Sequence, residues 1–197
     1  MRRLLTALAA SAIVLSLAGC ASNDQLAEQY AEGSNKGYIA GDGTIMEIPA
    51  AERGAAVSFS GVDETGQQIS SADYLGEVLV VNFWYAGCAP CRAEAPLLNE
   101  VNAGFAPGSA ATIGVNVRDQ ADTALAFNEK FGVSYPSIID TNDGAVQLAF
   151  SGTVPANAVP TTIVLDQQGR VAARILGRIA DKSILTSIVN DLVNAPS

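Results

Sequence analysis

The sequence contains no histidine and only three cysteines, and both scarcities restrict its chemistry. A structural zinc site needs about four ligands, mostly cysteine and histidine. Beyond the N-terminal segment the chain offers only Cys88 and Cys91. Covalent haem attachment uses Cys-x-x-Cys-His, whereas Arg92 stands in the place of that histidine. The sequence therefore argues against zinc, copper–histidine and haem sites, and we expect neither a metal nor a cofactor.

Basic residues are also scarce, with 11 lysines and arginines against 20 aspartates and glutamates. Removing residues 1–19, which hold two of the arginines and no acid, leaves nine basic against 20 acidic residues and a formal charge of −11. Such a charge disfavours binding to nucleic acid and direct electrostatic attraction to anionic lipid. We therefore expect no nucleic-acid partner.

Long hydrophobic runs are absent except at the N-terminus, where residues 4–17 are too short to span a bilayer comfortably. Two arginines precede this run and small residues follow it, which is the pattern of a secretory signal. The stretch LAGC at 17–20 resembles the lipobox of bacterial lipoproteins, which implies cleavage before Cys20 and a lipid on its sulfur. An ordinary signal peptide with a chance cysteine is the alternative. Lipidation would leave one even cysteine pair in an oxidising compartment.

The chain divides into three predicted parts. Residues 1–19 are predicted to be the signal peptide of a lipoprotein. Residues 20–45 are rich in small, polar and glycine residues and are predicted to be a flexible tether. Residues 46–197 are long enough for one domain with a substantial core. We find no internal repeat.

The pattern of apolar residues in this domain predicts an α/β fold. Two short strands, at 56–60 and 67–69, flank turn residues 63–66 and form an N-terminal β-hairpin. The nearly continuous apolar run at 78–84 predicts a central strand buried on both faces. The other predicted strands span 111–117, 137–139, 161–166 and 171–176. One predicted helix runs from Cys91 to about residue 105, and three more span 122–131, 144–150 and 182–193. This order predicts a central mixed β-sheet with helices on both faces.

Cys88 and Cys91 are separated only by Ala89 and Pro90, in the run NFWYAGCAPCRAEAP at 82–96. A structural disulfide across two residues restrains little chain entropy, because the stabilisation grows with loop length. The same proximity suits a reversible redox pair, since one thiol can attack the mixed disulfide that the other forms. If the pair opens a helix after a buried strand, the helix macrodipole favours the first thiolate. The spacing favours a redox pair over a structural disulfide.

The stretch WYAGCAPCRAEAP resembles the thioredoxin superfamily and, within it, the membrane-anchored TlpA/ResA-like thiol-disulfide oxidoreductases. The similarity runs from about Val57 to Leu192 and includes VVNFW at 80–84 and VPTTIVLDQQGRV at 159–171. It implies a thioredoxin-like fold with the β-hairpin as an N-terminal extension. It also implies that Cys88 attacks a substrate disulfide and that Cys91, expected to lie further under the helix start and away from solvent, resolves the adduct.

The resemblance also assigns a proton-handling residue. Thioredoxin has a buried acid in the strand before its cysteines, where this chain has Asn82, which cannot accept a proton from the second cysteine. ResA-like members have a glutamate three residues after the second cysteine, which matches Glu94 and implies that it manages the proton of Cys91. The alternative is a first-turn glutamate that only complements the helix dipole.

Four further residues are predicted to form the substrate-binding surface. Pro160, preceded by Val159, matches a family proline that is cis and faces the disulfide; an ordinary trans proline at the start of an edge strand is the alternative. Trp84 and Tyr85 are expected to shield the cysteines and frame the docking surface of the partner, although packing alone would also explain Trp84.

The resemblance implies an exported, lipid-anchored oxidoreductase on the outer face of the cytoplasmic membrane, acting on protein disulfides. A membrane thiol carrier of the CcdA type would resupply its electrons, and apocytochrome c in cytochrome c maturation is among its possible substrates. The strongly oxidising DsbA type has a histidine between its cysteines, and this chain has none. We therefore expect a reductant with a potential below roughly −200 mV.

Three alternatives are weighed against this function. A general disulfide oxidase or isomerase would use the same residues. A thiol peroxidase would carry Pro-x-x-x-Thr-x-x-Cys, whereas Val81 and Tyr85 occupy the proline and threonine positions. A non-catalytic lipoprotein would use the thioredoxin fold as a binding scaffold, and its cysteine pair would be redox-inert.

Overall fold

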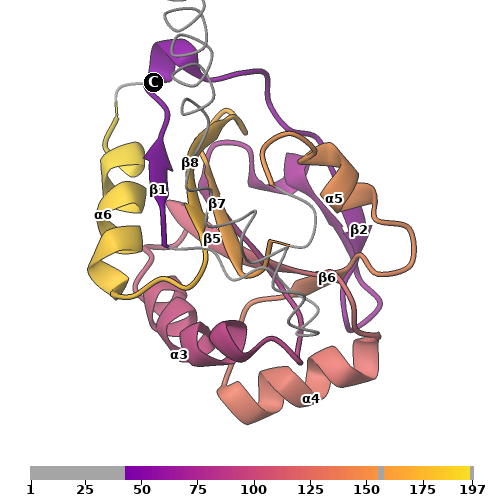
Figure 1. Ribbon diagram of the computed structural model, residues 1–197. Coiled ribbons are helices and arrows are strands. Elements are labelled where there is room, and N and C mark those ends of the chain that lie inside the picture. The colour runs from indigo at the N-terminus through magenta and orange to yellow at the C-terminus, as the bar shows by residue number, and fades with distance from the viewer. Residues whose placement is uncertain (1–42, 155–157, 196–197) are drawn as a thin grey trace, which may run out of the picture. The chain divides into compact units, whose positions relative to one another are not determined.

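A mixed six-stranded sheet with helices on both faces organises the protein (Figure 1). The computed structural model describes residues 43–154 and 158–195, so the predicted signal peptide, Cys20 and most of the tether lie outside it. The strands are β1 (Ile45–Glu47), β2 (Ser60–Val62), β3 (Gln68–Ser70), β4 (Val78–Trp84), β5 (Ala110–Asn116), β6 (Ser137–Ile139), β7 (Thr161–Leu165) and β8 (Val171–Leu176). The helices are α3 (Ala89–Ala103), α4 (Ala121–Phe131), α5 (Ala145–Ala149) and α6 (Lys182–Val193), with 3-10 turns η1 (Ala50–Glu52) and η2 (Ser71–Tyr74). No helix in these ranges is long and apolar enough to cross a membrane.

Strand β4 lies at the centre of the sheet, as its apolar run predicts. The strand order is β1-β8-β7-β4-β5-β6, in which β4 pairs parallel with β5 and antiparallel with β7. All seven residues of β4 are buried. Strands β2 and β3 form the predicted hairpin as a separate two-stranded sheet.

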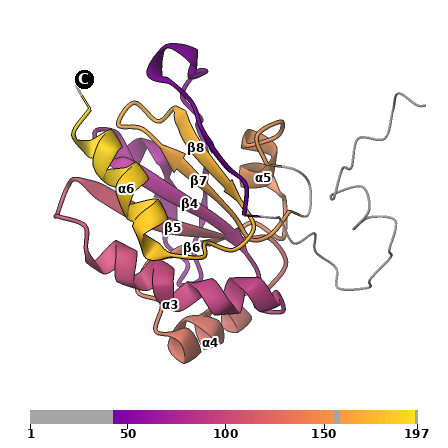
Figure 2. The ribbon, with the colours of Figure 1, turned by 60° about the vertical axis from the view of Figure 1, so that its left-hand side comes forward.

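Alternate residues of β4 contribute to two hydrophobic cores, because successive side chains of a strand point to opposite faces of the sheet. Val78 and Val80 pack with residues of α3 and α6 on one face, where Figure 2 shows these two helices side by side. Leu79, Val81 and Phe83 pack on the other face with residues of the hairpin, α4 and α5. The predicted placement of helices on both faces is therefore confirmed.

The start of the domain differs from the sequence prediction. Residues 43–45, predicted to belong to the tether, already pair with β8: the amide of Gly43 donates to the carbonyl of Leu176 (2.8 Å), and β1 runs antiparallel to β8 as an edge strand of the sheet. Ile45 and Met46 are 42% and 38% exposed, so this short strand has no buried face to give it an alternating pattern. The first hairpin strand also lies later than predicted, at Ser60–Val62.

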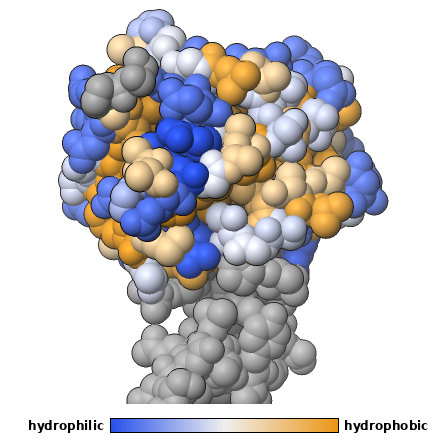
Figure 3. All heavy atoms as spheres, turned by 90° about the horizontal axis from the view of Figure 1, so that it is seen from above, coloured by the Kyte–Doolittle hydropathy of each residue, from blue (hydrophilic) through white to orange (hydrophobic). Residues whose placement is uncertain are grey.

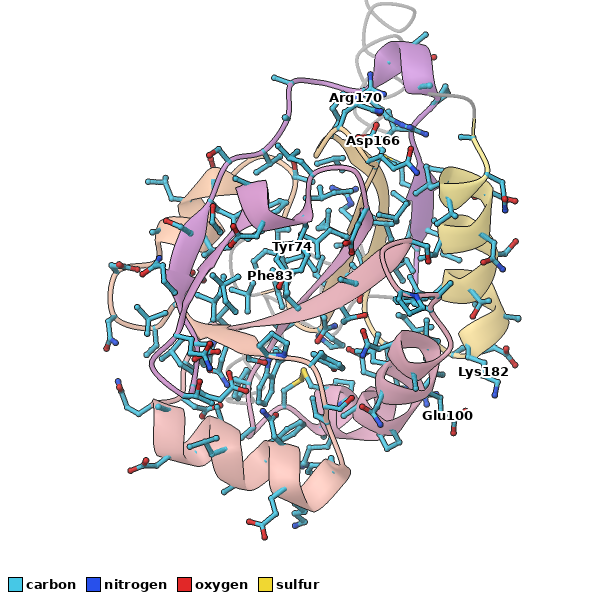
Figure 4. The ribbon with its side chains drawn as sticks, turned by 180° about the vertical axis from the view of Figure 1, so that it is seen from behind. Tyr74, Phe83, Glu100, Asp166, Arg170 and Lys182 are labelled. Atoms are coloured by element: carbon cyan, nitrogen blue, oxygen red, sulfur yellow. A yellow bond between two sulfur atoms is a disulfide. The ribbon has the colours of Figure 1, made fainter. Side chains whose placement is uncertain are left out.

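Asp166 lies in the turn between β7 and β8, at the end of the sheet opposite to Gly43. Its buried carboxylate accepts hydrogen bonds from Arg53 (3.1 Å) and Arg170 (2.8 Å), which tie the N-terminal segment to the β7–β8 turn (Figure 4). Seen from above, this end shows hydrophilic and hydrophobic side chains intermixed (Figure 3).

The exposed Lys182–Glu100 pair joins α6 to α3 at 2.9 Å and contributes little to stability, because solvent screens it.

Candidate active site

The two cysteines lie where β4 passes into α3. Cys88 is the N-cap of α3, and Pro90 lies in the first turn, where a missing amide hydrogen costs nothing. The amide of Cys91 donates to Cys88 Sγ at 3.2 Å, in the place of a conventional side-chain oxygen cap. The loop before them is held by Asp119, whose carboxylate accepts from the amide of Ala86 at 2.6 Å. The site is thus built on the end of a rigid strand.

Cys88 and Cys91 are joined in a disulfide with an S–S distance of 2.07 Å. Its sulfur atoms appear in yellow in Figure 4. Cys91 is 2% exposed, as predicted, but Cys88 is 0% exposed, so solvent exposure does not distinguish the two. What distinguishes them is their surroundings: Cys88 Sγ faces an amide at the positive end of α3, which favours its thiolate once reduced. Cys91 instead lines a small cavity between β4, α3 and α4.

Glu94 lies one helical turn after Cys91 and is buried, with 1% of its surface exposed. Its Oε1 accepts from Asn82 Nδ2 (3.0 Å) and its Oε2 accepts from the amide of Ile179 (3.0 Å). Burial raises the pKa of Glu94 to about 7, although these two hydrogen bonds and the charge of Arg178 oppose the shift. Glu94 is therefore not the solvated first-turn residue of the alternative interpretation.

Asn82 does not take the proton-handling role of Glu94; it holds the Glu94 side chain in place. Its Nδ2 donates both to Glu94 and, at 3.1 Å, to Thr162 Oγ1 on the neighbouring strand β7. Burial raises the pKa of Tyr135, and the charge of the nearby Glu94 raises it further. Sequence reasoning missed Thr162, Ile179 and Tyr135, because only the folded sheet brings them next to a residue so far away in the chain.

Pro160 lies directly before β7, and its peptide bond with Val159 is cis, which confirms the prediction. Phe83 pairs with Thr161, so Pro160 lies beside the end of β4 that leads to Cys88. The carbonyl of Pro160 accepts from the amide of Gly177 at 2.8 Å. The pairing of β7 with β4 thus places Pro160 at the same end of these strands as the cysteines.

The aromatic residues before the cysteines are largely buried. Trp84 is 4% exposed, packs on Phe127 at 4.3 Å between ring centroids, and donates from Nε1 to Ser137 Oγ at 3.1 Å. Gly114 leaves room for this contact, since a Cβ there would lie 2.7 Å from Trp84 Nε1. Tyr85 is 7% exposed, beneath the guanidinium of Arg118. Their predicted shielding role agrees with this burial, and a role in docking stays a prediction.

A groove of about 680 Å³ opens beside Val159. Its lining comprises Phe83, Val117, Asp143, Gly144, Gln147, Leu148, Ser151, Gly152, Thr153, Val154, Ala158, Val159 and Arg174. Leu148 is 73% exposed at this groove, an unusual position for a large apolar side chain. The groove therefore offers apolar surface next to the edge of the sheet that carries the cysteines.

A buried strand that leads into a Cys-x-x-Cys helix start, with a cis proline on the adjacent strand, defines a thiol-disulfide oxidoreductase of the thioredoxin fold. The chain belongs to the AhpC/TSA family, whose sequence profile matches residues 53–174. The predicted fold class and enzyme class are thereby confirmed.

Individual relatives agree with this assignment. The thiol-disulfide oxidoreductase ResA of Geobacillus kaustophilus is 30% identical over 129 residues, which cover 66% of this chain and 71% of the relative. Among solved structures, a DsbF homologue from Corynebacterium diphtheriae is 36% identical with a TM-score of 0.68, covering 77% of this chain and 95% of its own. A secreted thiol-disulfide isomerase from Corynebacterium glutamicum is 35% identical with a TM-score of 0.68, covering 80% and 97%.

Proposed function

We propose that the protein is an exported, lipid-anchored reductant of protein disulfides, with Cys88 as nucleophile and Cys91 as resolving thiol. The observation that carries the proposal is the Cys88–Cys91 pair at the start of α3. The Cys88 thiolate attacks a substrate disulfide, whose second sulfur leaves as a thiolate. Cys91 then attacks Cys88 Sγ and releases the reduced substrate, so two electrons pass to the substrate and the protein keeps the disulfide.

The reducing direction rests on the residues between the cysteines. Ala89 and Pro90 carry no charge or hydrogen-bonding side chain that would hold the Cys88 thiolate, so the reduced form gains little special stabilisation. A pair whose reduced form is strongly stabilised is an oxidant, and the opposite holds for a reductant. A CcdA-type membrane carrier is the electron donor in this proposal, and apocytochrome c is among the substrates.

The proposed anchor at Cys20 suits a membrane electron donor. The described domain begins at Gly43, which pairs with Leu176, and the next residue, Gly177, donates to Pro160. Gly43 therefore lies at the same end of the sheet as the cis proline. Residues 21–42 span at most about 75 Å when fully extended, so a lipid on Cys20 would keep the active site near the membrane.

The substrate-binding residues in this proposal are Pro160, Val159 and Tyr85, with the groove beside Val159 as the surface for an unfolded or extended chain. Trp84 supports the site from the core. The apolar lining of the groove fits a substrate whose residues near the cysteine are apolar, because burying such side chains is favourable.

A second candidate direction is isomerisation, because the similar protein from Corynebacterium glutamicum is named an isomerase. Two assays separate the directions. Reduced protein is mixed with an oxidised Cys-x-x-Cys-His peptide, and separately with a protein that carries scrambled disulfides. A reductant should become fully oxidised by the peptide and leave two thiols on it. Recovery of the native disulfides from the scrambled protein, with no net oxidation of the enzyme, would contradict the reductant proposal.

A further inference from the structure

A small cavity lies between β4, α3 and α4 and is lined by Cys91. Its volume is about 10 Å³, which is at the lower limit for a single water molecule. The residues that line it are Asn82, Trp84, Cys91, Ala95, Leu98, Phe127, Asn128, Val133 and Tyr135. Asn82, Asn128 and Tyr135 carry polar side chains, so the cavity offers the partners that a bound water needs.

One polar atom beside this cavity has no hydrogen-bond partner. Oδ1 of Asn128 is buried and accepts no hydrogen bond from the described part of the chain. Its orientation is fixed by the other end of the amide, because Nδ2 donates to Glu64 Oε1 at 2.8 Å and a carboxylate oxygen needs a donor there. Glu64 in turn accepts from the amide of Ser137 at 2.7 Å. An unpaired buried oxygen costs free energy unless a bound water satisfies it.

We propose that this cavity holds one water molecule that bridges Asn128 Oδ1 and Cys91 Sγ, and that Asn128 is thereby a positioning residue for the resolving thiol. The proposal rests on the function proposed above. The water donates one hydrogen to Asn128 Oδ1 and the other to the Cys91 thiolate, which needs a donor at the moment it attacks Cys88. In the thiol form, the Cys91 S–H donates to the same water instead.

Among the other side chains that line the cavity, Asn82 and Trp84 have no hydrogen left to donate to Cys91. Both hydrogens of Asn82 Nδ2 are already given to Glu94 and Thr162. Trp84 Nε1 is given to Ser137. The ionisable groups around the cavity are Tyr135, which lines it, Glu94, which is reached through Asn82, and Glu64, which is reached through Asn128. Both carboxylates disfavour a thiolate when ionised, so a neutral donor next to Cys91 acts in the opposite sense.

The test compares Asn128→Leu, which fills a similar volume without an acceptor, with Glu129→Gln as a control. Glu129 is the exposed neighbour of Asn128 on α4, so this control changes the helix surface and leaves the contact of Asn128 with Glu64 intact. In the reduced, ¹³C-cysteine-labelled protein, the pKa of Cys91 is read by NMR from its own Cβ signal. We expect Asn128→Leu to raise the pKa of Cys91 by about one unit, equivalent to a tenfold loss of thiolate, and Glu129→Gln to leave it unchanged.

An unchanged pKa in Asn128→Leu, or an equal shift in both variants, would overturn the proposal, because Asn128 would then have no specific effect on the Cys91 thiol. A high-resolution crystal structure of the reduced wild type gives an independent reading: we expect one solvent peak within hydrogen-bonding distance of both Asn128 Oδ1 and Cys91 Sγ, and an empty cavity would also overturn it. Failure of the wild type to reduce any disulfide would instead refute the proposed function, and the water site would still be decided by these two measurements.

Discussion

Replacing Cys91 with alanine should abolish turnover and leave substrates covalently attached to Cys88. Cys88 still attacks a substrate disulfide in this variant, but no second thiol is present to break the mixed disulfide. The position of Cys88 at the positive end of α3, with its Sγ facing the amide of Cys91, is independent of the Cys91 side chain and is retained. We expect the adducts to accumulate in cells and to be identified by mass spectrometry after non-reducing separation.

Cys88→Ala is the matched control. It leaves a single thiol that is 2% exposed and lacks the N-cap position at the start of α3, so it should capture few substrates. A cytochrome-maturation reductant should be trapped with Cys-x-x-Cys-His proteins, whereas a general disulfide enzyme should be trapped with many unrelated exported proteins. If Cys91→Ala captures no more than the double variant, the catalytic assignment fails and the scaffold function takes its place.

Replacing Glu94 with glutamine should slow turnover about 100-fold, the typical size of a lost general acid or base. Burial gives Glu94 a pKa of about 7, so both protonation states are populated at neutral pH and the residue can give or take the Cys91 proton. The pH profile of turnover should therefore lose its inflection near pH 7. The control is Glu100→Gln on the same helix, where the side chain is exposed and pairs only with Lys182. A profile identical to wild type in Glu94→Gln would make Glu94 a structural residue.

The same substitution should change how stability depends on pH. A carboxyl group whose folded-state pKa is raised destabilises the fold as pH rises, because the unfolded chain ionises first. For Glu94 the loss begins near the ordinary carboxyl pKa of 4.5 and is complete above a pH of about 7, a difference of about 3 kcal/mol. Glutamine cannot ionise, but its amide opposes one of the two donors, Asn82 and Ile179. It should therefore be less stable than wild type at pH 5 and recover relative to it by pH 8, as measured by denaturant unfolding.

The central strand and the cysteine helix were predictable from sequence because their signals are local. The apolar run at 78–84 is typical of a strand buried on both faces, and β6, β8 and α6 begin and end at the predicted residues. The cysteine spacing and the Val-Pro-Thr-Thr stretch likewise predicted the redox pair and the cis bond before Pro160.

The surroundings of the site were not predictable, because they depend on residues far apart in the chain. Whether Glu94 is solvated or buried depends on Ile179, which is 85 residues away in sequence. The burial of Cys88 and the hydrogen bond from Asn82 to Thr162 depend in the same way on how β7 packs against β4. Strand β1 was missed because its residues are exposed and carry no pattern.

A redox titration of the cysteine pair decides whether Cys88 and Cys91 form a reducing redox couple. The purified protein is equilibrated in two series of buffers, one of graded reduced and oxidised glutathione and one of graded reduced and oxidised dithiothreitol, and the free thiols of Cys88 and Cys91 are counted by alkylation and mass spectrometry. We predict one reversible two-electron transition in which both cysteines react together, with a midpoint below about −200 mV. A midpoint above about −200 mV, or a pair that reduces only after the protein is unfolded, would contradict this prediction.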